Sequence, residues 1–265
     1  MSVALIAGEG ALPEEIARRL ALDGKKPVVY AIREEYGAFA ESAADVVPVV
    51  KTALAATIRD MFTRGVRQVM FAGVVPKTLI YRSAMLDGMA RDLVASLDVR
   101  DDHTLLGGIV AAFEKAGFEV VGYRSLLGDM LATRGRIAGR EPTPEERSDI
   151  AYGTEIARVV VPLSFGQSVI VNRHSVVAVE AMEGTDAAIL RAGSLCERGV
   201  LVKMIKEGQD ERYDIPTVGP QTVRLMASAG LGCLAIQAGW TLILSPDEFR
   251  ACAEEKGIAV VGIDY

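Results

Sequence analysis

The sequence is poor in aromatic residues, cysteine and histidine. Aromatic residues make up 6% of the 265 positions, and there are three cysteines and two histidines. The cysteines Cys196, Cys233 and Cys252 lack CxxC spacing, so neither a disulfide framework nor a zinc site is expected, and a reducing, cytoplasmic compartment fits. The formal net charge is −6. This charge argues against nucleic acid as a partner, because non-specific binding to nucleic acid needs a basic surface.

A targeting segment and a long unbroken hydrophobic run are also lacking. The first ten residues, MSVALIAGEG, carry no basic group before their apolar stretch, which is unlike a secretory signal. The longest apolar region, 227–244, is interrupted by glycines and one glutamine, and is too short for a membrane span. It predicts a buried helix or a pair of strands. Half of all residues are hydrophobic, which is ample for an aliphatic core.

The first half of the chain alternates strand and helix patterns, which favours a parallel sheet with crossover helices. A polar stretch with Gly and Pro, TRGRIAGREPTPEERSD, then runs from 133 to 149 and predicts a domain boundary. We therefore predict an α/β fold in two domains, 1–132 and 149–265, joined by a linker at 133–148. The predicted strands of the first domain are 3–7, 27–32, 46–50, 66–72 and 118–122, and its helices are 13–22, 52–64 and 101–116.

The second domain shows a mixed pattern. Two β-branched runs, 168–172 and 175–180, are joined by Arg173-His174 and predict a hairpin with His174 as a turn residue. The remaining predicted elements are helices from Pro144 past 156, at 185–192 and from about 222, and strands at 201–205 and 258–263.

Gly8-Glu9-Gly10 lies between the first predicted strand and helix, where a dinucleotide-binding loop would lie. The third glycine of that fingerprint is replaced by Pro13, so the motif is weak. Two interpretations stay open. Gly8 and Gly10 contact a phosphate at the helix N-terminus, or they form a plain tight turn.

Two further motifs combine acids with the start of a helix. Asp101-Asp102-His103-Thr104 either caps an apolar helix or supplies ligands for a divalent cation. In the stretch 180–186, a strand delivers Glu180 and Glu183, Gly184 permits a sharp turn, and Thr185 or Asp186 opens the next helix. This arrangement fits a helix cap or an anion site.

The densest cluster of charge is KMIKEGQDERYDIPTVGP at 203–220. Asp210 and Asp214 would share one face if the segment turned helically, and could then hold a metal ion or activate water. Lys203 and Lys206 could bind phosphate as point charges, and Arg212 could bind it bidentately. The alternative is a solvated charged loop.

Four stretches together resemble the LpxI class of UDP-2,3-diacylglucosamine pyrophosphatases of bacterial lipid A biosynthesis. They are LIAGEGALP at 5–13, VRDDHTLL at 99–106, VEAMEGTDAAILRAG at 179–193 and GQDERYDIPTVGPQT at 208–222. Each motif is modest alone, but the set is specific and runs through both halves in order. The sequence departs from the pattern at AGVVPKTL, 72–79, where an Arg-Pro pair is expected.

The resemblance implies two domains, the first Rossmann-like and the second mixed α/β, with the lipid held in a cleft between them. It implies hydrolysis of the diphosphate to UMP and 2,3-diacylglucosamine 1-phosphate (lipid X), dependence on a divalent cation, and an essential aspartate in the C-terminal domain. Both Asp210 and Asp214 are eligible as that aspartate. With Glu183 they are the expected ligands of Mg²⁺ or Mn²⁺. The expected substrate-binding residues are Gly8, Gly10, Asp102, Thr185, Lys203, Lys206 and Arg212.

These interpretations combine into a specific expectation for the charged stretch 203–214. Its side chains should face the cleft between the domains and join Glu183 and Asp186 in one network, because buried charges are costly unless they are paired. The two acyl chains of the implied substrate suggest access from the surface of the inner membrane. Because no basic amphipathic anchor is evident, we expect this contact to be transient. A homodimer is left open.

Two other functions stay open at this point. One is an oxidoreductase or epimerase that uses NAD or a nucleotide sugar, against which stand the incomplete glycine loop and the lack of a Tyr-x-x-x-Lys motif. The other is a non-enzymatic lipid- or nucleotide-binding protein, which would need Asp210 and Asp214 only for folding.

Overall fold

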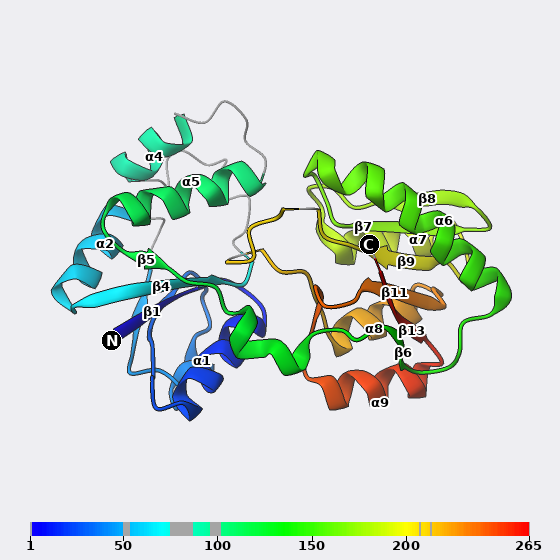
Figure 1. Cartoon of the computed structure of the whole chain (residues 1–265), viewed down its shortest axis with the longest axis horizontal. Helices are drawn as coiled ribbons and strands as arrows, with labels where there is room; N and C mark the ends of the chain where they lie inside the picture. The colour runs from blue at the N-terminus through cyan, green and yellow to red at the C-terminus, as the bar shows by residue number, and fades with distance from the viewer. Residues whose placement is uncertain are drawn as a thin grey trace. The chain divides into compact units, whose positions relative to one another are not determined.

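A computed structural model describes residues 2–49, 54–74, 87–95, 102–206, 208–212 and 214–264. By its contacts the chain divides into two compact units (Figure 1). Unit 1 comprises Met1–Leu127 together with Asp210–Asp214, and unit 2 comprises Gly128–Gln209 and Ile215–Tyr265. The acidic segment 210–214 therefore belongs to unit 1, although the residues on both sides of it belong to unit 2.

Unit 1 contains the predicted Rossmann-like parallel sheet. Its five strands have the order β3-β2-β1-β4-β5 and all pair in parallel. The strands are β1 (Ser2–Ala7), β2 (Val28–Ala31), β3 (Asp45–Pro48), β4 (Val66–Ala72) and β5 (Glu119–Val120), and the helices are α1 (Leu12–Leu22), α2 (Leu54–Thr63), α4 (Gly88–Ala95) and α5 (Asp102–Lys115).

Helices cover both faces of this sheet, which explains why β1 is apolar at consecutive positions and not only at alternate ones. Helix α1 lies on one face, and α2 and α5 lie on the other (Figure 1). On the second face Met61 of α2 and Phe113 of α5 pack in one apolar cluster with Ile6 and Phe71 of the sheet. The alternation of strand and helix predicted from the sequence is confirmed here.

Unit 2 contains a mixed sheet of six strands in the order β6-β13-β11-β9-β7-β8. The three central strands β13, β11 and β9 are parallel, whereas β6, β7 and β8 each pair antiparallel to a neighbour. The strands are β6 (Gly135–Ala138), β7 (Ser168–Asn172), β8 (Ser175–Val179), β9 (Val200–Lys203), β11 (Cys233–Gln237) and β13 (Ala259–Ile263); β10 (Thr217–Val218) and β12 (Leu242–Ile243) form a separate parallel pair.

Four α-helices sandwich this sheet: α6 (Pro144–Val160), α7 (Gly184–Gly193), α8 (Pro220–Ser228) and α9 (Pro246–Lys256). Successive strand residues point to opposite faces, so Val202 packs with Ala157 of α6 while Leu201 packs with Ile189 of α7 and Phe249 of α9. Figure 1 shows α8 and α9 below the sheet. Helices thus cover both faces of the sheet around the central strand β9, and the charged stretch begins at the last residue of this strand, Lys203.

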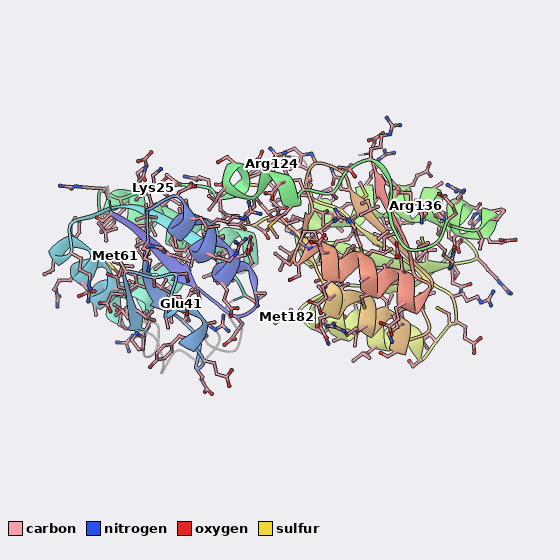
Figure 2. All side chains as sticks on the ribbon, turned by 90° about the horizontal axis from the view of Figure 1, so that it is seen from below. Lys25, Glu41, Met61, Arg124, Arg136 and Met182 are labelled. Atoms are coloured by element: carbon pink, nitrogen blue, oxygen red, sulfur yellow. The ribbon has the colours of Figure 1, made fainter. Side chains whose placement is uncertain are left out.

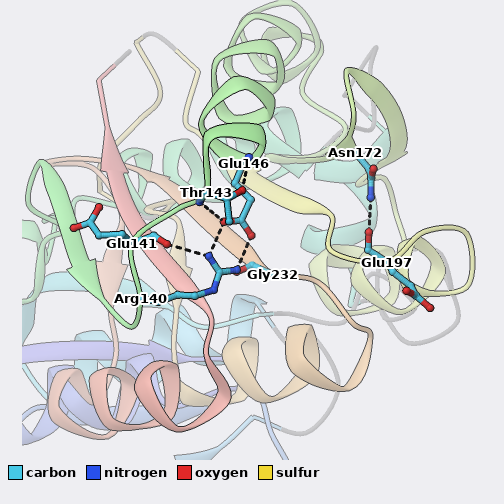
Figure 3. Close-up of polar contacts among 7 residues, drawn as sticks. All are labelled: Arg140, Glu141, Thr143, Glu146, Asn172, Glu197 and Gly232. Carbon is cyan, nitrogen blue, oxygen red and sulfur yellow. Dashed lines mark hydrogen bonds and ion pairs between the residues drawn. The ribbon is translucent and has the colours of Figure 1, made fainter.

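The stretch 133–148, expected to be a linker, is an integral part of unit 2. Strand β6 pairs with β13, and Thr143 forms a capping box with Glu146 at the start of α6 (Figure 3). Arg140 donates to both carboxylate oxygens of Glu146 at 2.6 Å and to the carbonyl of Gly232 at 3.0 Å. The polar residues that suggested a linker are instead used in a helix cap and in an ion pair of which only Glu146 is buried.

The hairpin predicted at 168–180 is confirmed. Arg173 and His174 form its turn with φ values of 49° and 58°, and both of their N–H groups donate to the buried carboxylate of Asp149 at 2.8 Å. The apolar region 227–244 contains the end of α8 followed by the strands β11 and β12. None of the helices in the part of the chain that the structure describes is long and apolar enough to span a bilayer.

Candidate active site

The acidic segment 210–214 leaves the sheet of unit 2 after β9 and has no helical residue among those described. The condition under which Asp210 and Asp214 would share one helical face is therefore not met. Both aspartates are half-buried, and neither is the fully exposed group of a solvated loop. A turn shapes the segment, because the N–H of Arg212 donates to Oδ1 of Asp210 at 3.0 Å.

Arg212 is the centre of the contacts made by this segment. Its Nε lies 2.9 Å from Oδ1 of Asp210, and its Nη2 lies 2.6 Å from Oδ2 of the same carboxylate. On its other side, Nη1 donates to Oε1 of Glu114 in α5 at 2.6 Å. The hydrogen bond to Asp210 and then that to Glu114 raise the pKa of the guanidinium, which stays charged. Arg212 is therefore held between two carboxylates of unit 1.

Two further contacts fix the segment to unit 1. Glu211 accepts a hydrogen bond from Nη1 of Arg124 at 2.9 Å. Arg124, labelled in Figure 2, is the first residue of the short 3-10 helix Arg124–Met130 that follows β5. Gly122 lies against the backbone of the segment. A Cβ at this glycine would lie 3.3 Å from Cα of Arg212 and 3.4 Å from the carbonyl oxygen of Glu211. A larger residue at position 122 would displace the acidic segment.

Lys203, the last residue of β9, lies in a second polar cluster, inside unit 2. Its side chain is 7% exposed, and its Nζ donates to Oγ1 of Thr185 at 2.9 Å and to Oγ of Ser168 at 3.4 Å. Oε2 of Glu180 lies 4.0 Å from the same nitrogen, and Thr185 donates to Oε1 of Glu180 at 2.9 Å. A buried ammonium thus has a carboxylate and two hydroxyls as partners.

The residues of this cluster change the pKa of the Glu180 carboxyl. Burial acts to raise its pKa, but the charge of Lys203 and the hydrogen bonds from Ser168, Thr185 and the N–H of Gln167 together hold it below its ordinary value of 4.5. Glu180 is therefore ionised at neutral pH and balances the charge of Lys203.

The other acids expected in this network lie elsewhere in unit 2. Glu183 pairs with Arg191 at 2.6 Å near the surface, and Asp186 is exposed. The partner of Lys203 is instead Glu180, which follows strand β8 directly. Asp210 and Asp214 belong to unit 1 and Glu183 to unit 2. A metal site shared by all three stays a prediction.

Lys206 remains available as a cation within unit 2. It is half-buried, and its Nζ donates to the hydroxyl of Ser164 at 3.0 Å. Within the described ranges, no group of three or more His, Cys, Asp or Glu side chains is arranged to hold a metal ion.

The glycine loop after β1 is bonded to the loop after β4. The N–H groups of Gly8 and Glu9 donate to the carbonyls of Ala72 and Val74 at 2.8 Å, and Val74 donates back to Glu9 at 2.9 Å. A Cβ at Gly8 would lie 2.6 Å from the carbonyl oxygen of Val74, so this position needs glycine for close approach. Gly10 follows with φ of 96°.

A cation lies beside Gly10. Arg33, just after β2, donates from Nη1 to the carbonyl of Gly10 at 3.1 Å and pairs with Glu14 at 3.0 Å. Because the N–H groups of Gly8 and Glu9 are already used, a phosphate here would have to bind Gly10, the first turn of α1 or Arg33. Asp101 lies outside the described residues, as does the side chain of Asp102, although α5 begins at Asp102 close to the predicted start.

Sequence reasoning missed the residues that anchor the predicted site. Glu114 and Arg124 were not singled out, because their partners lie 98 and 87 positions away in the sequence. Glu180 was placed at the end of a predicted strand, and it follows β8 directly. Its pairing with Lys203 could not be read from that pattern.

The fold defines a two-unit α/β protein with a Rossmann-like unit and a mixed-sheet unit. The acidic segment 210–214 belongs to the Rossmann-like unit, although the residues on both sides of it belong to the mixed-sheet unit. Comparisons with known proteins give this class a family. A model described as the LpxI N-terminal domain matches residues 2–130, and one described as the LpxI C-terminal domain matches residues 133–261. The chain is also 34% identical over 275 aligned positions to the UDP-2,3-diacylglucosamine pyrophosphatase LpxI of Caulobacter vibrioides, covering 98% of this chain and 96% of that relative. The chain belongs to the LpxI family.

Proposed function

We propose that this protein hydrolyses the diphosphate of UDP-2,3-diacylglucosamine, releasing UMP and 2,3-diacylglucosamine 1-phosphate (lipid X). The observation that carries the proposal is the acidic segment 210–214, in which the carboxylates of Asp210 and Glu211 are held on unit 1 by Arg212 and Arg124. The name of the Caulobacter relative supports the same substrate. Positioned carboxylates of this kind suit a hydrolase, because attack on a diphosphate needs an oriented water and neutralisation of developing charge.

The reaction is a substitution at phosphorus. An oxygen of water bonds to one phosphorus, the bridging P–O bond breaks, and the other phosphate leaves with the bridging oxygen. The carboxylates of Asp210 and Asp214 are both eligible to orient the water and accept its proton. Lys206 can exchange its hydroxyl partner, Ser164, for a phosphate oxygen, because its ammonium is only half-buried.

We propose Mg²⁺ or Mn²⁺ as the cofactor. Carboxylate oxygens are the ligands that these ions prefer, so Asp210, Asp214 and Glu183 have suitable chemistry. Both oxygens of Asp210 accept hydrogen bonds from Arg212, which leaves Asp214 and Glu183 as the better candidates. Such an ion would neutralise charge on the diphosphate and favour ionisation of the attacking water.

Substrate contacts of Gly8, Gly10, Asp102, Thr185, Lys203 and Arg212 remain proposals. Among these, the contacts of Lys203 and Thr185 favour a supporting role, because they already bind each other and Glu180. The proposed lipid cleft and the transient contact with the membrane surface rest on the chemistry of a substrate with two acyl chains, and the proposed cytoplasmic location rests on the cysteine pattern. The loop after β1 disfavours the dinucleotide alternative, because the N–H groups of Gly8 and Glu9 are bonded to the carbonyls of Ala72 and Val74.

The test is to incubate the metal-free protein with UDP-2,3-diacylglucosamine and to measure UMP and the sugar 1-phosphate. We expect both products in equal amounts when Mg²⁺ or Mn²⁺ is added, and none in excess EDTA. Full activity in EDTA would overturn the metal proposal alone. Absence of UMP with either ion would overturn the proposed function.

A further inference from the structure

The guanidinium of Arg212 has no nitrogen without a carboxylate partner: Nε and Nη2 meet Asp210, and Nη1 meets Glu114. Asp210 uses both oxygens in this contact. Such a planar, bidentate arrangement fixes orientation as well as distance, which a single point charge cannot do. The orientation of the Arg212 guanidinium is therefore fixed by Asp210 on one side and by Glu114 on the other.

Glu114 lies in the last turns of α5, a helix whose residues Val110 and Phe113 are packed in the core of unit 1. This helix gives Arg212 a rigid support. Asp214 follows Arg212 by two residues, and Glu211 is tied to Arg124 on the preceding side. Because Asp214 belongs to the same short segment of unit 1, we expect it to move when the contacts of Arg212 and Glu211 are lost.

We propose that Arg212 is a positioning residue, which clamps the acidic segment between Asp210 and Glu114 and thereby sets the position of Asp214 toward the substrate. This inference rests on the proposed function. It gives Asp210 and Asp214 different roles, since Asp210 acts through Arg212 and Asp214 meets the reacting groups. It also gives Arg212 a role other than the direct phosphate contact expected from the sequence, because a phosphate would have to displace two carboxylates.

The kinetic test compares Arg212→Gln, Arg212→Lys, Glu114→Gln and the double variant Glu114→Gln/Arg212→Gln. We expect kcat to fall about 10-fold in Arg212→Gln with KM within about 2-fold of wild type, because a group acting only on position removes no ground-state binding. Arg212→Lys should be almost as impaired, since an ammonium cannot bridge two carboxylates with the same geometry. Glu114→Gln should lose about 3-fold, and the double variant should be no worse than Arg212→Gln, because both changes break one clamp.

Arg64 offers a matched control within unit 1. It too bridges two carboxylates, those of Asp60 and Asp45, at 2.7 Å each, and lies on the surface at the end of α2. Arg64→Gln should leave kcat and KM unchanged. Hydrogen–deuterium exchange of the peptide spanning 208–215 should rise in Arg212→Gln and stay at the wild-type level in Arg64→Gln.

Three outcomes would overturn the positioning role. One is a rise in KM with unchanged kcat in Arg212→Gln, which marks a direct substrate contact. The second is full additivity of the losses from Glu114→Gln and Arg212→Gln. The third is unchanged exchange of peptide 208–215 in Arg212→Gln. If the wild-type protein releases no UMP, the proposed function fails by itself, and the exchange measurement still decides whether the clamp exists.

Discussion

Two cations separated by nine positions, Lys203 and Arg212, have opposite environments. Lys203 ends a central strand of unit 2, and its side chain is 7% exposed, with Glu180 at 4.0 Å. Arg212 belongs to unit 1, and its side chain is 37% exposed, with Asp210 and Glu114 both at 2.6 Å. The closer pairing is found at the more exposed cation.

The comparison shows that a short distance between two charges does not by itself indicate a large contribution of the pair to the free energy of unfolding. Removing one partner of a buried pair leaves a charge without water or counter-charge, which is strongly destabilising. Exposed pairs contribute little to the free energy of unfolding, because water screens them. We therefore expect the Lys203 cluster to support the fold and the Arg212 cluster to support the position of the acidic segment.

The largest effect on stability is expected for Glu180→Gln. This change leaves the ammonium of Lys203 buried without its carboxylate, so the free energy of unfolding should fall by about 3 kcal/mol, more than 100-fold in the unfolding equilibrium. Urea denaturation monitored by circular dichroism measures it. Glu248→Gln, which removes the partner of Arg224 on the surface of the same unit, is the control and should have a far smaller effect. Equal losses in the two variants would contradict the comparison.

The stabilisation by Glu180 should also appear in the pH dependence of the free energy of unfolding. The pKa of Glu180 is lowered in the folded protein, so its stabilisation is present above the unfolded value of about 4.5 and is lost as the pH falls through the folded value. Denaturation series between about pH 7 and pH 3 should show a steeper loss for wild type than for a variant lacking Glu180. Identical slopes would mean that Glu180 has the same pKa in the folded and unfolded chains.

A smaller effect is expected when both charges are removed together. Lys203→Met with Glu180→Leu replaces a buried pair by apolar side chains, and such replacements are often neutral or stabilising. The double variant should therefore lie within about 1 kcal/mol of wild type. Its turnover then tests the sequence prediction that Lys203 binds phosphate: near-normal UMP release marks a structural role, and a large loss marks a substrate contact.

The smallest effect on stability is expected at the clamp. Glu114→Gln should change the free energy of unfolding by only about 0.5 kcal/mol, and added salt should reduce this difference, because the pair is partly exposed. A loss as large as that of Glu180→Gln would mean that the clamp supports the fold and not only the segment.

Local pattern was sufficient to predict most of the fold. Strand β1 and helix α1 were predicted from an apolar run, a glycine loop and Pro13, all within the first 22 residues. Helix α9 begins with Pro246, Asp247 and Glu248 after Ser245, a start signal that could have been used. The stretch 133–148 was predicted wrongly as a linker, because its polar residues form a helix cap and a half-buried ion pair, and composition does not distinguish these from a linker.

The candidate site was only partly predictable. The motif supplied Asp210, Arg212 and Asp214, but not the attachment of these residues to unit 1. That attachment depends on Glu114, Gly122 and Arg124, which are distant in sequence and carry no local pattern. The expected contact of Lys203 with phosphate was inferred from its charge alone. Its burial beside Glu180 depends on the arrangement of the strands in the sheet, which the sequence pattern does not give.

The most direct measurement is the initial rate of UMP release by wild-type protein and by Asp214→Asn, with the melting temperature of each recorded. Asparagine keeps the size of the side chain and removes its charge, so the fold should be unchanged. We expect turnover to fall by about 10²-fold or more, the scale of a positioned acid–base or metal-binding group. Near-normal turnover in a folded Asp214→Asn protein would contradict the assignment of catalysis to the acidic segment.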